Sequence, residues 1–337
     1  MRSIHLSPMN GRCRAGFTPL FRDSYASTIR SNCVLGRCSA THVRAQMEEW
    51  DTVSPPIVWT FEPSVLVGVC ALTVAYVWAW RQARRPGMPH PPGLGRLSLF
   101  AGSMICVLVA LVSPVDNLSR DLMVMHMVQH MLLLDLMPVL LILSLTKGLM
   151  RPVTKRVMVI EQRAGLLATP AFAVLMYVGM MGLWHIPAMY DYALAHADVH
   201  VLEHLCFSTA GFLYWWHLLS PIRGRKHMTG MGTIVYMSIT KFFVGILGIV
   251  LTFSTHSLYP WYQDHPHYWG LSARVDQNLA GVFMALEQSM IMGVALVYIV
   301  VKMLSEGEKR GPKEDQYGTA MANYRAAIAA HRSTHAD

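Results

Sequence analysis

Two pairs of histidines with the same spacing are the residues best suited to chemistry in this chain. His126 and His130 are four residues apart, as are His200 and His204, so each pair would share one face of a helix. His185 lies between the two pairs in the sequence. Imidazole binds copper, zinc and iron, and two imidazoles at this spacing can hold one ion together. We therefore expect these five histidines to bind a metal.

Methionines near the histidines favour copper as that metal. The chain has 24 methionines, of which Met123 and Met127 flank the first pair and Met181 precedes His185 by one helical turn. Thioether sulfur is a soft ligand that selects Cu(I). The pattern predicts a copper site, while most of the other methionines are expected to fill the core or face lipid.

The composition indicates a membrane protein. Of 337 residues, 53% are hydrophobic and only 14% are charged, whereas soluble domains average about 25% charged residues. A bilayer core requires roughly 20 apolar residues per helix, and lipid leaves backbone groups no partners outside a helix. The predicted fold is an all-α polytopic bundle of about seven transmembrane helices. The expected spans are 59–80, 97–113, 121–145, 166–186, 199–219, 232–254 and 277–303.

Basic residues alternate between the loops and predict the orientation. The loops after the first, third and fifth spans and the tail are rich in Lys and Arg, whereas the opposite loops hold only Arg120 and Arg274. The positive-inside rule then places the C-terminus in the cytoplasm and the start of the first span outside. The five histidines would lie at the outer ends of their spans. This distribution accounts for the net charge of +8 without nucleic acid.

The chain divides into three predicted parts. A seven-helix transmembrane domain covers residues 57–303, and a cytoplasmic tail covers 304–337. Residues 1–56 are expected to be disordered or an extension that is not translated, with Met47 as the true start. Residues 1–46 are rich in Arg, hold one acid, Asp23, and lack the apolar segment of a signal peptide.

Three charged residues fall inside the predicted spans: Asp135, Lys241 and Glu287. A charge at the bilayer centre costs about 2.5–3.5 kcal/mol on insertion scales, so each should face the protein interior. We expect an ion pair of Lys241 with Glu287 or Asp135, the alternative being a proton or ion path. A rotation of about 100° per residue places Asp135 opposite His126, outside the histidine cluster.

Four short segments around these residues form an ordered set: His126–His130 (HMVQH), Trp184–Asp191 (WHIPAMYD), His200–His204 (HVLEH) and Asp276–Gly281 (DQNLAG). Together they resemble the multi-span CtaG family, which are assembly factors for haem–copper cytochrome c oxidases in bacteria and differ from the single-span copper chaperone of the same name. The resemblance covers residues 57–303. It implies seven spans in the bacterial inner membrane, a role in oxidase maturation through copper supply, and no enzymatic turnover.

The leading hypothesis is a non-catalytic assembly factor that binds or delivers copper at the outer face, with the oxidase catalytic subunit or other assembly factors as partners. Its ligands would be the five histidines, and the side chains expected to fix the imidazole tautomers by hydrogen bonds are Glu203, Asp276 and Gln277. One alternative is a b-type cytochrome with two axial histidines, for example His130 with His204. The other is a copper or proton transporter that uses Asp135, Lys241 and Glu287.

Overall fold

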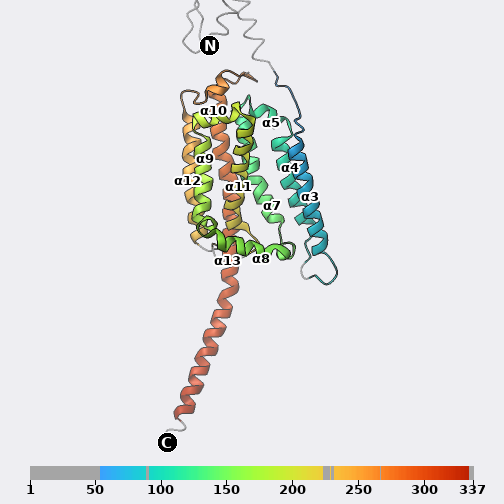
Figure 1. Ribbon diagram of the computed structural model, residues 1–337. Helices are drawn as coiled ribbons and strands as arrows, with labels where there is room; N and C mark the ends of the chain where they lie inside the picture. The colour runs from blue at the N-terminus through green and yellow to red at the C-terminus, as the bar shows by residue number, and fades with distance from the viewer. Residues whose placement is uncertain (1–53, 89–90, 223–227, 229–230, 266, 334–337) are drawn as a thin grey trace, which may run out of the picture. The chain divides into compact units, whose positions relative to one another are not determined.

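The computed structural model describes residues 54–88, 91–222, 228, 231–265 and 267–333 (Figure 1). The predictions for residues 1–46 and for a start at Met47 lie outside this part. All helices of the described residues belong to one compact unit, Pro56–His267 with Leu271–Asp337, whereas Tyr268–Gly270 is a turn of a second unit. In chain order the helices are α3 (Pro63–Ala83), α4 (Leu94–Leu111), α5 (Pro114–Ser119), α6 (Met123–Met131), the π-helix η1 (Leu132–Leu136), α7 (Met137–Ser144), α8 (Lys147–Ala164), the 3-10 helix η2 (Gly165–Ala168), α9 (Pro170–Trp184), α10 (Pro187–Ala195), α11 (Ala197–Leu219), α12 (Met231–Phe253), the 3-10 helix η3 (Pro260–Gln263) and α13 (Ala273–Ser333).

The all-α prediction is confirmed, because the described residues contain no strand. Each predicted span overlaps a helix, but fewer than seven helices are both long and apolar enough to cross a bilayer. Five meet this condition: α3, α4, the continuous run of α6 to α7, α12 and the Ala273–Ser305 part of α13. A sixth is added if α8 with η2 and α9, which meet at a bend of 62°, form one broken span. The structure therefore supports five or six spans.

Local signals explain why the fourth predicted span is divided. The hydroxyl of Thr169 accepts a hydrogen bond from Phe172 N, and Pro170 follows as the first residue of α9. An N-cap threonine followed by proline starts a new helix. Helix α9 is left with 15 residues, or about 22 Å. Helix α11 is longer, but Asp198, Glu203 and its histidines make it less apolar than the five candidate spans.

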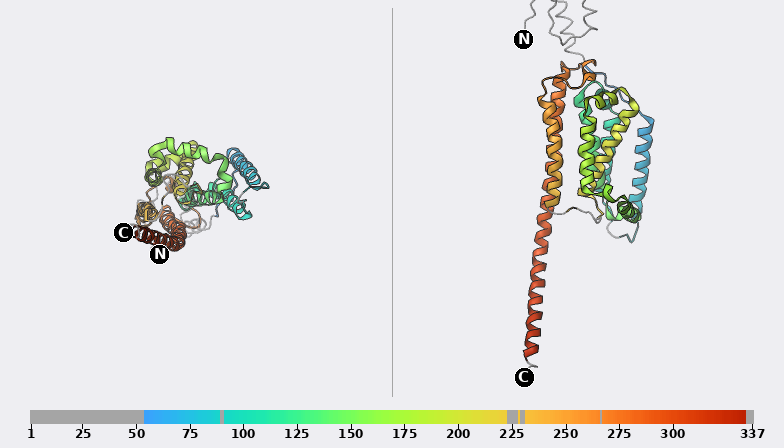
Figure 2. Two further views of the ribbon diagram at one scale, coloured as in Figure 1. Left: turned by 90° about the horizontal axis from the view of Figure 1, so that it is seen from below. Right: turned by 60° about the vertical axis from the view of Figure 1, so that its left-hand side comes forward.

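Helix α8 differs in direction from the bundle helices. It lies across the end of the bundle opposite α5 and α10 (Figure 1), and its sequence alternates apolar residues with Lys147, Arg151, Lys155 and Arg156. At the same end α13 continues as one helix beyond its neighbours (Figure 2), so the tail from residue 304 extends the last span helically to Ser333.

Two glycines allow a close contact between α12 and α13. A Cβ atom at Gly281 of α13 would lie 2.6 Å from Thr252 N of α12, and one at Gly248 would lie 3.4 Å from Gly281 O. Small residues let helix backbones approach in this way in membranes. Gly248 and Thr252 of α12 therefore pack against α13.

A candidate metal centre

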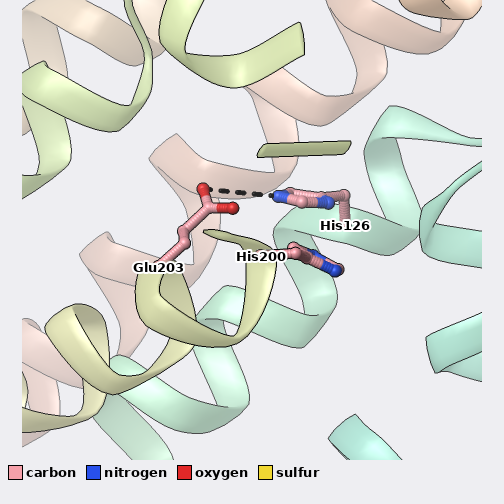
Figure 3. A group of neighbouring side chains, drawn as sticks. All are labelled: His126, His200 and Glu203. Atoms are coloured by element: carbon pink, nitrogen blue, oxygen red, sulfur yellow. Dashed lines mark ion pairs between the residues drawn. The ribbon is translucent and has the colours of Figure 1, made fainter. Parts of the chain in front are cut away.

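Three side chains from two facing helices form the centre of the site (Figure 3). His126 comes from α6, and His200 and Glu203 come from α11. One ligand atom of each lies within 4.8 Å of the other two, and all three side chains are at least 95% buried. Glu203 Oε1 is 3.7 Å from His126 Nε2 and 3.5 Å from His130 Nε2. The carboxylate therefore lies among the imidazoles.

The other members of the two histidine pairs extend this cluster. The rings of His126 and His200 stack at a centroid distance of 5.2 Å, and those of His130 and His204 meet edge-on at 5.7 Å. Within each pair the rings are 4.1 and 4.2 Å apart. The spacing of four residues on each helix thus brings four imidazoles together between α6 and α11.

His185 lies at the edge of the cluster, just after the last residue of α9. Its Nδ1 donates a hydrogen bond to Met181 O at 2.7 Å, which leaves Nε2 with a free lone pair. That nitrogen has no hydrogen-bond partner among the described residues, and His185 lines a cavity together with His130. The backbone contact fixes the tautomer that a metal ligand would need.

In the part of the chain that the structure describes, many polar atoms of this cluster are buried without a hydrogen-bond partner. They include both ring nitrogens of His126 and His130, the Nε2 atoms of His185, His200 and His204, and both carboxylate oxygens of Glu203. Leaving a buried polar atom unsatisfied costs about 1–3 kcal/mol, so such a concentration requires an explanation. Imidazole nitrogens and a carboxylate are suitable donors for a transition metal.

Asp276 and Gln277 do not have the role expected from the sequence. The carboxylate of Asp276 accepts hydrogen bonds from Met123 N at 2.5 Å and Val124 N at 3.1 Å. The amide of Gln277 accepts from Leu258 N and donates to His256 O. Neither residue is hydrogen-bonded to the histidine cluster. The reason is that α13 begins beside the start of α6, where free backbone N–H groups are strong donors.

Asp135 lies outside the group of His126, His200 and Glu203, as expected, but it is close to His130 and His185 of the cluster. Its carboxylate accepts hydrogen bonds of 2.8 Å from the Tyr177 hydroxyl and from Trp215 Nε1. The π-helical turn η1 changes the rotation per residue between α6 and α7, which a regular helix does not anticipate. Asp135 consequently lines the same cavity as His130 and His185.

The expected ion pair of Lys241 is not present. Lys241 Nζ donates hydrogen bonds to Ser289 Oγ at 2.6 Å and to Ala285 O at 3.3 Å, both on α13. Glu287 lines the cavity, and its Oε1 has no hydrogen-bond partner. The three charged residues therefore do not form one network.

A group of tyrosines that the sequence analysis did not single out covers the cluster. The ring of Tyr190 on α10 lies 4.9 Å from that of His126, and its hydroxyl is 3.0 Å from that of Tyr262. Tyr262 donates to Ser119 O, and Tyr259 donates to His185 O. Burial raises the pKa of the Tyr190 and Tyr262 phenols well above the usual range, so both keep their protons. The position of Tyr190 in the WHIPAMYD segment was the available signal.

The fold and the buried cluster define a polytopic α-helical membrane protein with a candidate metal centre. Residues 74–306 match the sequence model of the family described as cytochrome c oxidase caa3 assembly factor (Caa3_CtaG), and the chain belongs to this family. The chain is also 20% identical over 281 residues to an uncharacterized protein of Mycobacterium leprae (strain TN), a match that covers 77% of this chain and 41% of that protein. It thus spans about two fifths of that relative's length. No solved structure matches the chain.

Proposed function

We propose that this protein assists the assembly of a haem–copper cytochrome c oxidase by binding copper as cargo at the buried cluster and passing it to the oxidase catalytic subunit. The observation that carries the proposal is the set of unpartnered donor atoms around His126, His200 and Glu203. A role in oxidase assembly agrees with the family, which also favours a non-catalytic protein.

The donors of the cluster fit copper chemically. His126, His200 and Glu203 are the residues that would hold the ion, and His130 and His204 lie in ring contact with them. The carboxylate offsets part of the charge of a bound cation, and attraction between opposite charges is stronger in a buried site than in water. Copper bound here would satisfy atoms that otherwise have no partner.

The positions of the charged segments support delivery at the outer face of the membrane. The basic helix α8 lies at one end of the bundle and α5 and α10, which flank the cluster, lie at the other (Figure 1). The positive-inside rule favours α8 and the tail on the cytoplasmic side of the bacterial inner membrane. Copper would then be received and released at the outer face.

A b-type cytochrome is supported less well than copper binding. His130 and His204, the pair suggested for haem, contact each other edge-on at 5.7 Å, with Phe207 only 4.3 Å from His130. These contacts leave no space for a haem between the two imidazoles. Transport is also supported less well, because Lys241 and Asp135 are each hydrogen-bonded to neutral groups.

Copper content of the purified full chain tests the proposal. We expect bound copper in the wild type and a loss of at least tenfold in affinity in His200→Ala and Glu203→Gln. Cells carrying either variant should mature less oxidase while the protein stays in the membrane. His196→Ala is the matched control, because His196 is exposed at the start of α11. Unchanged copper affinity and unchanged oxidase levels in both cluster variants would refute the site.

A further inference from the structure

A small cavity adjoins the histidine cluster at His130 and His185. Its volume of about 20 Å³ is enough for one water-sized species. Six side chains on its lining carry sulfur or imidazole groups that can bind a metal. Five come from α6, α9 and α13, and the sixth is His185, which follows α9. The six are Met127, His130, Met131, Met181, His185 and Met284. The cavity does not include His126, His200 or Glu203, so it is separate from the centre described above.

Thioether groups from three helices reach this cavity. Met127 of α6, Met181 of α9 and Met284 of α13 are each more than 90% buried. Thioether sulfur binds soft monovalent cations such as Cu(I). Methionine also fills irregular gaps in apolar cores, so the sulfur atoms alone would be weak evidence.

The imidazoles on the lining provide the independent evidence. His130 and His185 are 97% and 95% buried, and His130 has no hydrogen-bond partner at either nitrogen. His185 has none at Nε2, because only its Nδ1 is bonded to Met181 O. An apolar gap needs no unpaired imidazole, whereas a cation site needs such donors.

The acidic residues around the cavity favour a cation as its occupant. Asp135 and Glu287 both line it, and Glu287 Oε1 has no hydrogen-bond partner. A cation at membrane depth requires a neighbouring negative group. The volume admits one bare ion.

We propose that this cavity is a second metal site, which binds one soft monovalent cation of the Cu(I) type through Met127, Met181 and Met284 together with His130 and His185. The identification of the ion as copper rests on the proposed function. His130 lies 3.5 Å from Glu203 and also lines the cavity, so its imidazole adjoins both sites. The protein would then hold two ions, one among imidazoles and a carboxylate and one among thioethers.

Metal stoichiometry of the purified full chain tests this inference. Titration with Ag(I), a soft ion that does not change oxidation state, and with Cu(I) under reducing conditions should give two tightly bound ions per wild-type chain. The double variant Met181→Leu/Met284→Leu should bind one, because leucine conserves volume but cannot ligate. The control Met231→Leu/Met290→Leu changes two methionines that are 70% and 71% exposed and should still bind two.

The results separate the second site from the first. The double variant His200→Ala/Glu203→Gln should retain one ion, with sulfur neighbours visible by X-ray absorption. Two ions in Met181→Leu/Met284→Leu would overturn the cavity site and leave the proposed function intact. If the wild type binds one ion and only His200→Ala/Glu203→Gln loses it, the cavity site is also overturned and the proposed function stands. If the wild type binds no ion, both the cavity site and the proposed function are overturned. If the methionine variant does not fold, X-ray absorption of Cu(I) bound to the wild type tests the cavity site instead. Sulfur neighbours around the copper would support the site, and their absence would overturn it.

Discussion

Gly211 of α11 lies directly against the backbone of Leu134 in η1. A Cβ atom at position 211 would be 1.8 Å from Leu134 O and 2.7 Å from Leu134 C, which is far inside any van der Waals contact. This contact is where α11 crosses the π-helical turn that follows His130. The approach of the two backbones therefore helps to set the distance at which the two histidine pairs face each other.

Replacing this glycine tests the contact. Gly211→Ala should force α11 away from η1 and destabilise the protein by about 1–3 kcal/mol, the usual cost of overpacking. It should also weaken metal binding, because the imidazoles of α6 and α11 would separate. Thermal unfolding in detergent and metal titration measure both effects. Gly179→Ala is the control, since a Cβ there meets nothing within 4 Å. Equal melting temperatures for the two variants would contradict the prediction.

Asp276 is expected to act on the site through helix α6. Asp276→Ala removes the acceptor of two backbone N–H groups at the start of α6. The loss of a helix cap costs about 0.5–2 kcal/mol, so the variant should unfold more easily. Urea or thermal unfolding measures this change, and Asp198→Ala, at an exposed position in the first turn of α11, is the comparison. A variant as stable as this control would show that the cap is unimportant.

The hydroxyl of Tyr177 is expected to be a structural donor. Tyr177→Phe leaves the buried Asp135 carboxylate with one donor, Trp215 Nε1, in place of two. An unsatisfied buried acceptor costs about 1–3 kcal/mol, so the melting temperature should fall. Tyr192→Phe, which changes a 52% exposed tyrosine, should have little effect. The interpretation fails if both variants melt like the wild type.

The sequence predicted those features of the site that depend on one helix at a time. The spacing of four residues in each pair correctly placed His126 beside His130 and His200 beside His204, because helix geometry alone determines it. The predicted number of seven spans is not confirmed, because five or six helices are long and apolar enough to cross a bilayer. Counting runs of about 20 apolar residues does not show that a new helix, α9, starts after Thr169.

What the sequence could not predict depends on contacts between distant segments. Asp276 caps α6 although the two segments are more than 150 positions apart, and this partner is visible only once α13 packs beside α6. The position of Asp135 depends on the π-helical turn, for which the sequence analysis had no signal. Tyr262 contacts Tyr190 from the short 3-10 helix η3, where the α-helical period does not apply.

The last prediction concerns pH and the end of the bundle near the cluster. Burial raises the pKa of Asp116 in α5, although hydrogen bonds from Thr60 and Gln129 and the charge of Arg120 act in the opposite direction. An acid whose pKa is raised by folding stabilises the folded state when it is protonated. The contribution of Asp116 to the stability of the folded state is complete below the ordinary Asp pKa of about 3.9. This contribution is lost as the pH rises through the raised pKa.

Asp116→Asn should therefore stabilise the protein at neutral pH relative to the wild type, and this advantage should shrink as the pH falls through that window. Thermal unfolding of both proteins from pH 7 to pH 4 measures the difference. Asp264→Asn, at an exposed position, controls for the change in net charge. An advantage of Asp116→Asn that stays constant with pH would mean that the carboxylate is not the titrating group, because an uncharged cause has no reason to follow protonation.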